Sequence, residues 1–141
     1  MAIANSPSED FQLDSAGSEL LAGLRQSPPS INPKYFYDET GSDLFTQICD
    51  VPEYYPTRTE VGIFKQRASE IATAVGPIDV VIEPGAGNCE KIGYLLEDLN
   101  PQCYLPVDIS AEYLQQASAK LRLEFPLLEV KPVAADFSQD F

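Results

Sequence analysis

The sequence contains no histidine and few basic residues, and both deficits limit the ligands and partners that the protein can bind. Because histidine is absent and the three cysteines lack metal-ligand spacing, we expect no metal site. Nine Lys and Arg residues stand against 22 Asp and Glu residues, which gives a net charge of −13. Such an acidic surface repels phosphates, so we expect neither nucleic acid nor a membrane as a partner. A cationic ligand fits this charge better.

Long apolar stretches are also missing. No apolar run approaches the ~18 residues of a membrane span, and the N-terminus has no basic-then-apolar leader. The odd number of cysteines fits reduced thiols. We therefore expect a soluble, cytoplasmic protein. At 141 residues, 44% hydrophobic and 22% charged, the chain is long enough for a folded domain with a core.

The N-terminal half is predicted to be helical, with interruptions at prolines. Residues 1–32 form a segment that we expect to be partly disordered, because residues 1–15 are rich in polar and small side chains. A short helix is predicted around Leu20–Leu24. Residues 33–76 form a second, helical segment, which we expect to lie on the substrate side.

Two longer helices are predicted within this helical segment. One covers about residues 41–49, where apolar residues recur at helical spacing. The next is predicted to begin at Thr57, where Thr57 and Glu60 match a capping box, in which the two side chains satisfy each other's backbone amides. Gly76 is suited to end this helix.

Strands and helices alternate from residue 77 to residue 141. The apolar patterns predict the order strand, helix, strand, helix, strand at residues 78–83, 88–99, 103–108, 111–125 and 128–137, with Ser110 capping the second helix. This βαβαβ order predicts an α/β fold, namely the first half of a doubly wound, Rossmann-like sheet with strand order 3-2-1. The N-terminal helical segment precedes it.

The first predicted strand would lie at an open edge of this sheet. Its residues Val80-Val81-Ile82 are apolar, which is unusual for an edge strand. We therefore expect either that the chain is the N-terminal part of a longer enzyme or that it self-associates through this edge.

A glycine-containing loop follows the first strand in the stretch VVIEPGAGNCEK. Gly85 and Gly87 allow the backbone to approach a ligand closely, although two glycines could also serve only a tight turn. The dinucleotide fingerprint requires a third glycine where Glu90 stands, and the spacing of a P-loop is absent. A carboxylate at a helix start disfavours pyrophosphate. S-adenosylmethionine, which has no phosphate and carries a cationic sulfonium, fits the acidic loop better, with Glu83 near its amino-acid end.

The next two strands also end in residues that suit a nucleoside. Asp108 can accept hydrogen bonds from both ribose hydroxyls, unless it is only a helix cap. Asp136 can accept from an adenine amino group while Phe137 packs on the ring, although a simple turn has the same sequence. Three such strand ends in register indicate a cofactor site more strongly than any one of them.

The chain resembles a known enzyme family. PKYFYDETGSDLFTQICDVPEYYPTRTE, IEPGAGNCEK, YLPVDIS and VAADF are similar to the signature of the histidine-specific Nα-methyltransferases. This family uses S-adenosylmethionine to convert L-histidine to its trimethylated betaine, hercynine, in ergothioneine biosynthesis. The resemblance covers about residues 33–137 and departs from the family at Pro84 and Cys89. Members of the family are more than twice as long.

The resemblance implies roles for particular residues. Tyr37 and Tyr54 would border the amino-acid substrate, and their ring faces could contact a methylated ammonium. For the cofactor, the resemblance implies contacts from Gly85, Lys91, Asp108, Asp136 and Phe137. No catalytic base is identified.

Two alternatives to a histidine methyltransferase remain at this point. Enzymes of the same family methylate tryptophan-like amino acids, and the signature is less specific for the substrate than for the family. The short chain could instead be a non-catalytic module that binds the cofactor or a partner chain. The two tyrosines would then serve only aromatic packing.

Overall fold

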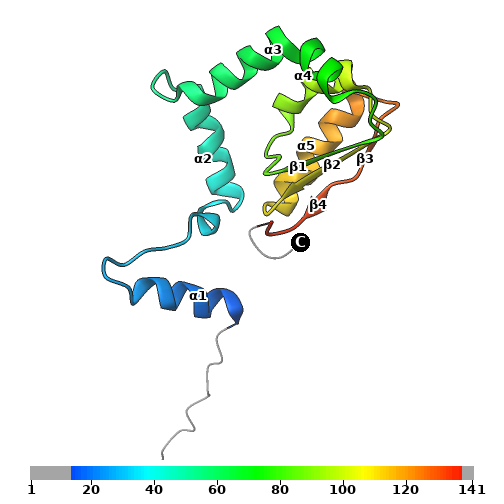
Figure 1. Cartoon of the computed structure of the whole chain (residues 1–141). Coiled ribbons are helices and arrows are strands. Elements are labelled where there is room, and N and C mark those ends of the chain that lie inside the picture. The colour runs from blue at the N-terminus through cyan, green and yellow to red at the C-terminus, as the bar shows by residue number, and fades with distance from the viewer. Residues whose placement is uncertain (1–13, 138–141) are drawn as a thin grey trace, which may run out of the picture. The chain divides into compact units, whose positions relative to one another are not determined.

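The computed structural model describes residues 14–137 and divides the chain into two compact units (Figure 1). The first unit ends at Tyr35 and the second begins at Phe36. The expected disorder of residues 1–15 falls almost wholly outside the described residues. The predicted segment boundaries after residues 32 and 76 also stay predictions.

The first unit is built on helix α1 (Ser15–Leu24), as the leucine pattern predicts. Asp14 caps this helix, because its side chain accepts a hydrogen bond of 2.7 Å from the amide of Gly17. A 3-10 helix, η1 (Pro33–Phe36), follows the proline-rich stretch.

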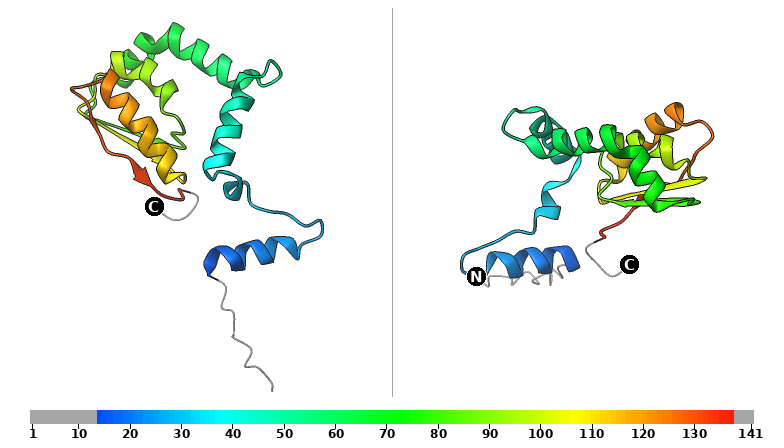
Figure 2. Two further views of the ribbon diagram at one scale, coloured as in Figure 1. Left: turned by 180° about the vertical axis from the view of Figure 1, so that it is seen from behind. Right: turned by 45° about the horizontal axis from the view of Figure 1, so that its top comes forward.

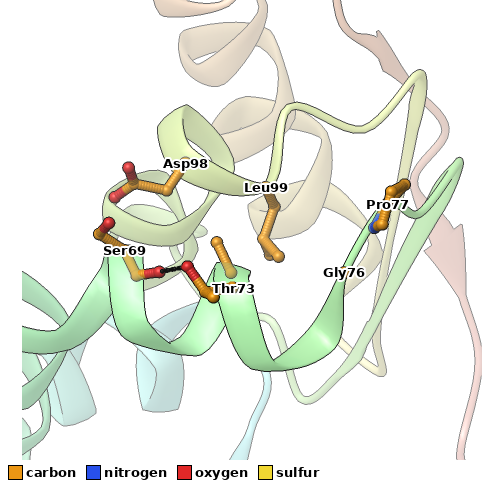
Figure 3. Close-up of a pocket in the computed structure, with 7 residues that line it drawn as sticks. Ser69, Thr73, Gly76, Pro77, Asp98 and Leu99 are labelled. Carbon is orange, nitrogen blue, oxygen red and sulfur yellow. Dashed lines mark hydrogen bonds between the residues drawn. The ribbon is translucent and has the colours of Figure 1, made fainter.

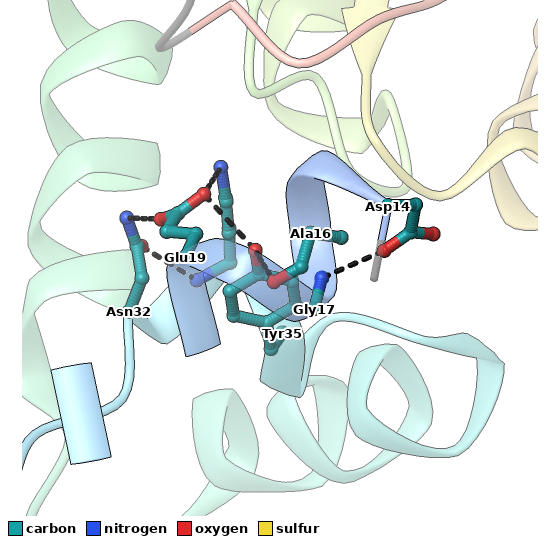
Figure 4. A network of polar contacts seen from close by, with 7 residues as sticks. Asp14, Ala16, Gly17, Glu19, Asn32 and Tyr35 are labelled. Carbon is teal, nitrogen blue, oxygen red and sulfur yellow. Dashed lines mark hydrogen bonds and ion pairs between the residues drawn. The ribbon is translucent and has the colours of Figure 1, made fainter. Parts of the chain in front are cut away.

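Glu19 organises the polar contacts of this unit (Figure 4). Its carboxylate accepts hydrogen bonds from Asn32 at 3.1 Å and from the Tyr35 hydroxyl at 3.0 Å, and it pairs with Lys34 at 2.8 Å. The Lys34 ammonium is the main reason why the pKa of Glu19 lies below its usual range, and the Tyr35 hydroxyl adds to this effect. These contacts hold residues 32–35 against α1.

The second unit opens with helices α2 (Glu39–Asp50) and α3 (Tyr55–Val75). Asp38 caps α2 by accepting from the amide of Gly41 at 2.7 Å. Gly76 ends α3 with a positive φ of 77°, as predicted.

The predicted capping box of α3 is wrong. The helix begins at Tyr55, two residues before Thr57, and has no side-chain cap. The Thr57 hydroxyl instead donates to Cys49 Sγ at 3.3 Å, and Glu60 pairs with Lys91 at 2.7 Å. Pro56 at the first turn explains the earlier start, because its fixed φ suits this position and its missing amide needs no partner.

The remaining chain forms a parallel sheet with two crossover helices. These elements are β1 (Val80–Pro84), α4 (Glu90–Leu99), β2 (Cys103–Asp108), α5 (Ala111–Glu124), β3 (Glu129–Val130) and β4 (Val133–Ala134). The order is β1-β2-β3, with β4 also paired to β2, and all pairs are parallel. The predicted strand order and α/β class are therefore confirmed.

The third predicted strand, residues 128–137, is divided into two short strands. Both pair with β2, at Cys103 and Tyr104 for β3 and at Val107 and Asp108 for β4. Pro132 lies between them and has no amide to donate, so it interrupts the ladder.

One face of the sheet carries the core. Both crossovers run in the same direction, so their right-handedness places α4 and α5 on one face, as the right-hand view in Figure 2 shows. Helix α3 packs against α4. The buried core residues of this face are Ala68, Ala86, Cys89, Ile92, Leu95, Leu96, Tyr104, Leu114, Leu121 and Val130.

Some apolar side chains of the strands are exposed to solvent. Val80 and Ile82 on the edge strand β1 are 48% and 60% exposed, and Val133 on β4 is also exposed. Among residues 14–137, no helix combines the length and the apolar character that crossing a bilayer requires.

Truncating the core should lower stability far more than truncating the surface of the same helix. Leu114 on α5 is 1% exposed, whereas Leu123 on α5 is 85% exposed. Leu114→Ala should lower the free energy of unfolding by about 2–5 kcal/mol, because it leaves a cavity. Leu123→Ala should change it by less than about 0.5 kcal/mol. Urea denaturation measures both, and equal effects would contradict this core.

Candidate functional site

The loop after β1 is folded tightly over the end of β2. Its amides at Gly85 and Ala86 both donate to the carbonyl of Val107, at 2.8 and 3.1 Å. Gly85 and Gly87 have positive φ angles of 72° and 54°, which favour glycine. Among residues 14–137, apart from Gly87 and its two chain neighbours, no atom lies within 4 Å of the position that a Cβ on Gly87 would take, so this part of the structure leaves space beside it.

Helix α4 begins directly after this loop. Cys89 occupies its N-cap position in the left-handed region, at φ 56°, and is 1% exposed. Burial raises the pKa of the Cys89 thiol to about 11, so the thiol stays protonated at neutral pH. Glu90, which stands where a dinucleotide fingerprint has glycine, pairs with Lys120 at 2.8 Å.

Asp108 ends β2 and is held by two backbone amides. Its Oδ2 accepts from Gly87 at 2.9 Å, and its Oδ1 accepts from Ser110 at 3.0 Å. The carboxylate therefore fixes the glycine loop against the start of α5. Its two oxygens keep further lone pairs, because an ionised carboxylate can accept about four hydrogen bonds.

The third strand end meets the glycine loop. The Phe137 ring lies 3.5 Å from the position that a Cβ on Gly85 would take, which is van der Waals distance, so the ring lies directly beside the glycine loop. The amide of Ala135 donates to the carbonyl of Asp108 at 3.0 Å. Asp136, which lies between Ala135 and Phe137 in the chain, is half-buried. The structure thus brings the three predicted strand ends to one edge of the sheet.

Glu83 lies at the end of β1 among buried groups. It accepts a 2.5 Å hydrogen bond from the hydroxyl of Tyr104, which is 0% exposed. Burial raises the pKa of Glu83 above its usual value, while the Tyr104 hydroxyl and the charge of Lys91 act in the opposite direction. The charges of Glu60 and Asp108 add to this rise in the pKa of Glu83.

Lys91 joins this strand end to helix α3. Its Nζ lies 2.7 Å from Glu60 Oε2, and both side chains are partly exposed. The predicted cofactor residue Lys91 therefore has an anionic partner from the PTRTE stretch, which sequence reasoning had placed in a capping box.

The two predicted substrate tyrosines both contact the ring of Phe45. The ring of Phe45 is 5.8 Å from that of Tyr37 and 5.9 Å from that of Tyr54, both in edge-to-face geometry. Phe45 belongs to α2, whereas the tyrosines precede α2 and α3. We call Tyr37, Phe45 and Tyr54 the aromatic trio. Helical spacing marked Phe45 only as an apolar residue.

Arg58 fixes the loop that carries Tyr54. Its guanidinium donates to the carbonyls of Val51 at 2.8 Å, Pro52 at 2.5 Å and Tyr54 at 3.2 Å. Sequence reasoning missed this role, because the three acceptors are backbone carbonyls, which any residue carries. The planar guanidinium suits three acceptors in different directions.

Hydroxyl groups join α2 to the start of α5. The Ser110 hydroxyl donates to the carbonyl of Tyr37 and lies 3.0 Å from the hydroxyl of Ser42. Thr46 and Tyr113 form a second link, with 2.8 Å between their oxygens. The prediction that Ser110 caps α5 is correct in position, but its side chain makes no capping bond.

One hollow among the described residues lies away from these groups. It is an open groove between the C-terminal ends of α3 and α4, lined by Ser69, Ala72, Thr73, Gly76, Pro77, Asp98 and Leu99 (Figure 3). Gly76 and Pro77 precede β1, so this groove is at the amino end of the strand, whereas ligands of such sheets bind at the carboxyl end.

Sheets of this parallel α/β kind bind their ligands beyond the carboxyl ends of the strands, where Gly85, Gly87 and Asp108 lie in this chain. The family model of the histidine-specific, SAM-dependent methyltransferases matches residues 16–141. The chain belongs to this family.

Relatives with named activities match much of the chain. A histidine N-alpha-methyltransferase of Mycolicibacterium smegmatis is 38% identical, and one of Mycobacterium tuberculosis is 35% identical, each over 99% of the chain. A 4-dimethylallyltryptophan N-methyltransferase of Claviceps purpurea is 36% identical over 72% of the chain. The chain spans 44% of the length of the two histidine enzymes and 30% of the Claviceps enzyme.

Replacing Arg58 should loosen the loop of residues 51–54. Arg58→Lys keeps the charge, but one ammonium cannot reach all three carbonyls in the same geometry. We expect faster amide hydrogen exchange at residues 51–55 and a stability loss on the order of 1 kcal/mol. Arg67→Lys, on the same helix and paired with Glu70, is the matched control. Equal amide exchange rates at residues 51–55 in both variants would show that Arg58 does not hold this loop.

Glu83 should make the second unit less stable as the pH rises. A carboxyl whose folded pKa is raised binds its proton more tightly when folded, so its contribution is full at low pH and is lost as the pH rises through the folded pKa. Glu83→Gln keeps an acceptor for Tyr104 and should raise the urea midpoint near pH 8 but not near pH 4.

Tyr104→Phe provides the opposite test of this assignment. It removes the hydroxyl that lowers the pKa of Glu83, so stability should fall more steeply with rising pH. If both variants keep the pH dependence of the parent chain, the pH dependence does not come from Glu83.

Proposed function

We propose that this chain forms the cofactor-binding part of an S-adenosylmethionine-dependent enzyme that methylates the α-amine of L-histidine to the trimethylated betaine hercynine. The observation that supports this most directly is the Asp108 carboxylate, fixed at the end of β2 by two backbone amides. Family membership and the histidine relatives supply the substrate class.

Asp108 is suited to bind a ribose. The amides of Gly87 and Ser110 take one acceptor position on each carboxylate oxygen. One position or more on each oxygen remains for a hydroxyl, and two adjacent hydroxyls match two adjacent oxygens. The two amides hold the carboxylate by one hydrogen bond on each oxygen, and a bound diol would add hydrogen bonds that order it more firmly.

The glycine loop fits a nucleoside that carries no phosphate. The open space beside Gly87 gives a ligand access to the backbone. Glu90 begins α4, and Glu83 and Asp108 lie close enough for their charges to act on Cys89 at its N-cap. This negative charge disfavours a pyrophosphate and favours a sulfonium. Phe137, 45% exposed beside Gly85, offers a surface for adenine, and Asp136 an acceptor for its amino group.

Glu83 and Lys91 are suited to the amino-acid end of the cofactor. They lie close enough for the charge of Lys91 to lower the pKa of Glu83. A carboxylate and an ammonium side by side complement the ammonium and carboxylate of an α-amino acid. Binding would exchange Glu60 for the cofactor carboxylate as the partner of Lys91.

The reaction requires positioning more than acid–base groups. When bound, S-adenosylmethionine would supply a sulfonium methyl to the neutral amine, with the N–C bond forming as the S–C bond breaks and the sulfur keeping the electron pair. The resulting ammonium would release its proton to solvent before each further methylation. Alignment of the reacting atoms accounts for up to about 7–11 kcal/mol of barrier lowering in favourable cases. The aromatic trio gives ring surfaces for the methylated ammonium, each worth about 0.5–2 kcal/mol.

A tryptophan-like substrate is the second candidate, because a named relative methylates a prenylated tryptophan. Histidine is favoured, since the histidine enzymes match 99% of the chain and the tryptophan enzyme 72%. A non-catalytic role would instead use the apolar edge strand, where Ile82 is 60% exposed, for association with another chain or a second copy.

Calorimetric titration with S-adenosylhomocysteine tests the cofactor assignment. We expect micromolar binding, and tighter binding when histidine is present than when tryptophan is present. Asp108→Asn should weaken binding about 10-fold to 100-fold, because a charged acceptor is lost. The control is Asp98→Asn, because Asp98 lines the groove between α3 and α4, away from the strand ends. This variant should leave binding unchanged.

The results of this titration distinguish the proposed histidine enzyme from the two alternatives. A folded chain that gives no heat with S-adenosylhomocysteine contradicts the proposal. Enhancement by tryptophan alone favours the second substrate, and concentration-dependent dimers without ligand binding favour the association role.

A further inference from the structure

Ser110 connects the cofactor side and the substrate side of the site through a continuous series of hydrogen bonds. Its amide donates to Asp108 Oδ1 at 3.0 Å, and its hydroxyl donates to the carbonyl of Tyr37. Asp108 Oδ2 accepts from Gly87 at 2.9 Å. Gly87, Asp108, Ser110 and Tyr37 thus form one connected path, which we call the serine relay.

The hydrogen positions within the relay follow from the inventory of donors. The carbonyl of Tyr37 can only accept, so the single hydroxyl hydrogen of Ser110 points to it. In the 3.0 Å contact between the two serines, Ser42 must then donate to Ser110. The orientation of the Ser110 hydroxyl is therefore determined by groups on both sides.

Burial makes the hydrogen bonds of the Ser110 hydroxyl sensitive to the loss of a partner. Ser42 is 6% exposed and Ser110 is 9% exposed, so water cannot readily replace a missing partner. Ser118, by contrast, is a fully buried serine on the same helix α5 whose hydroxyl has no partner among the described residues. The two serines differ in hydrogen bonding although both are buried.

We propose that Ser110 is a positioning residue that couples occupancy of the Asp108 site to the placement of Tyr37. This inference rests on the proposed function, because it takes Asp108 as the group that meets the ligand. A diol bound to Asp108 holds the carboxylate in place, the carboxylate holds the Ser110 amide, and the Ser110 hydroxyl holds the backbone of Tyr37 before α2. Ligand binding at β2 thereby orders one side of the aromatic trio.

The test follows amide NMR signals of the chain during titration with S-adenosylhomocysteine. In the parent chain, we expect the amides of Gly87 and Ser110 to shift together with those of residues 37–42. In Ser110→Ala, Gly87 should still shift, but residues 37–42 should not. Its affinity should fall by about 5-fold or more, as for a coupling of ordinary size.

Two further variants distinguish positioning from a general structural effect. Ser118→Ala removes a buried hydroxyl that makes no hydrogen bond, so it should keep the parent pattern and affinity. Ser110→Thr restores a hydroxyl and should recover the shifts at residues 37–42.

Each outcome decides between the two proposals. If Gly87 shifts in the parent chain while residues 37–42 do not, the coupling is wrong and the cofactor assignment stands. If Ser110→Ala keeps the parent shifts at residues 37–42, the coupling is wrong as well. If S-adenosylhomocysteine shifts no amide at Gly87, the proposed function fails and the coupling fails with it.

Discussion

The site depends on one interaction: the carboxylate of Asp108 accepts hydrogen bonds from two backbone amides. Through Gly87 it holds the glycine loop, and through Ser110 it holds the first turn of α5. A buried or half-buried carboxylate is stable only when such donors are present. The same arrangement that satisfies the fold leaves acceptor positions at the edge of the sheet, so structure and proposed binding use one group.

Helices α2 and α5 are joined largely by hydroxyls. Ser42 with Ser110, and Thr46 with Tyr113, bridge them, whereas several apolar side chains of α2, such as Leu44, stay exposed. Hydrogen bonds depend on direction more strongly than apolar contacts do. A polar junction therefore fixes the orientation of the residues that precede α2 and favours precise placement of the aromatic trio.

Sequence patterns predicted the alternation of strands and helices, the strand order and the meeting of three strand ends, because these follow from apolar periodicity and the handedness of crossovers. Local patterns failed where a tertiary partner competed, as at Thr57, or where a proline divided a strand, as at Pro132. The roles of Arg58 and Ser110 could not be predicted, since a donor to backbone carbonyls leaves no pattern in the sequence of its acceptors. Ser110 and Tyr37 are 73 residues apart.

The central claim is that the strand-end site takes a nucleoside that bears no phosphate. A competition measurement tests it most directly, with the affinities of S-adenosylhomocysteine, adenosine and NAD compared by calorimetry on the same chain. The account predicts that S-adenosylhomocysteine binds most tightly, that adenosine binds more weakly and competes with it, and that NAD is excluded by the acids around α4. Binding of NAD as tight as that of S-adenosylhomocysteine, or adenosine that does not compete, would contradict it.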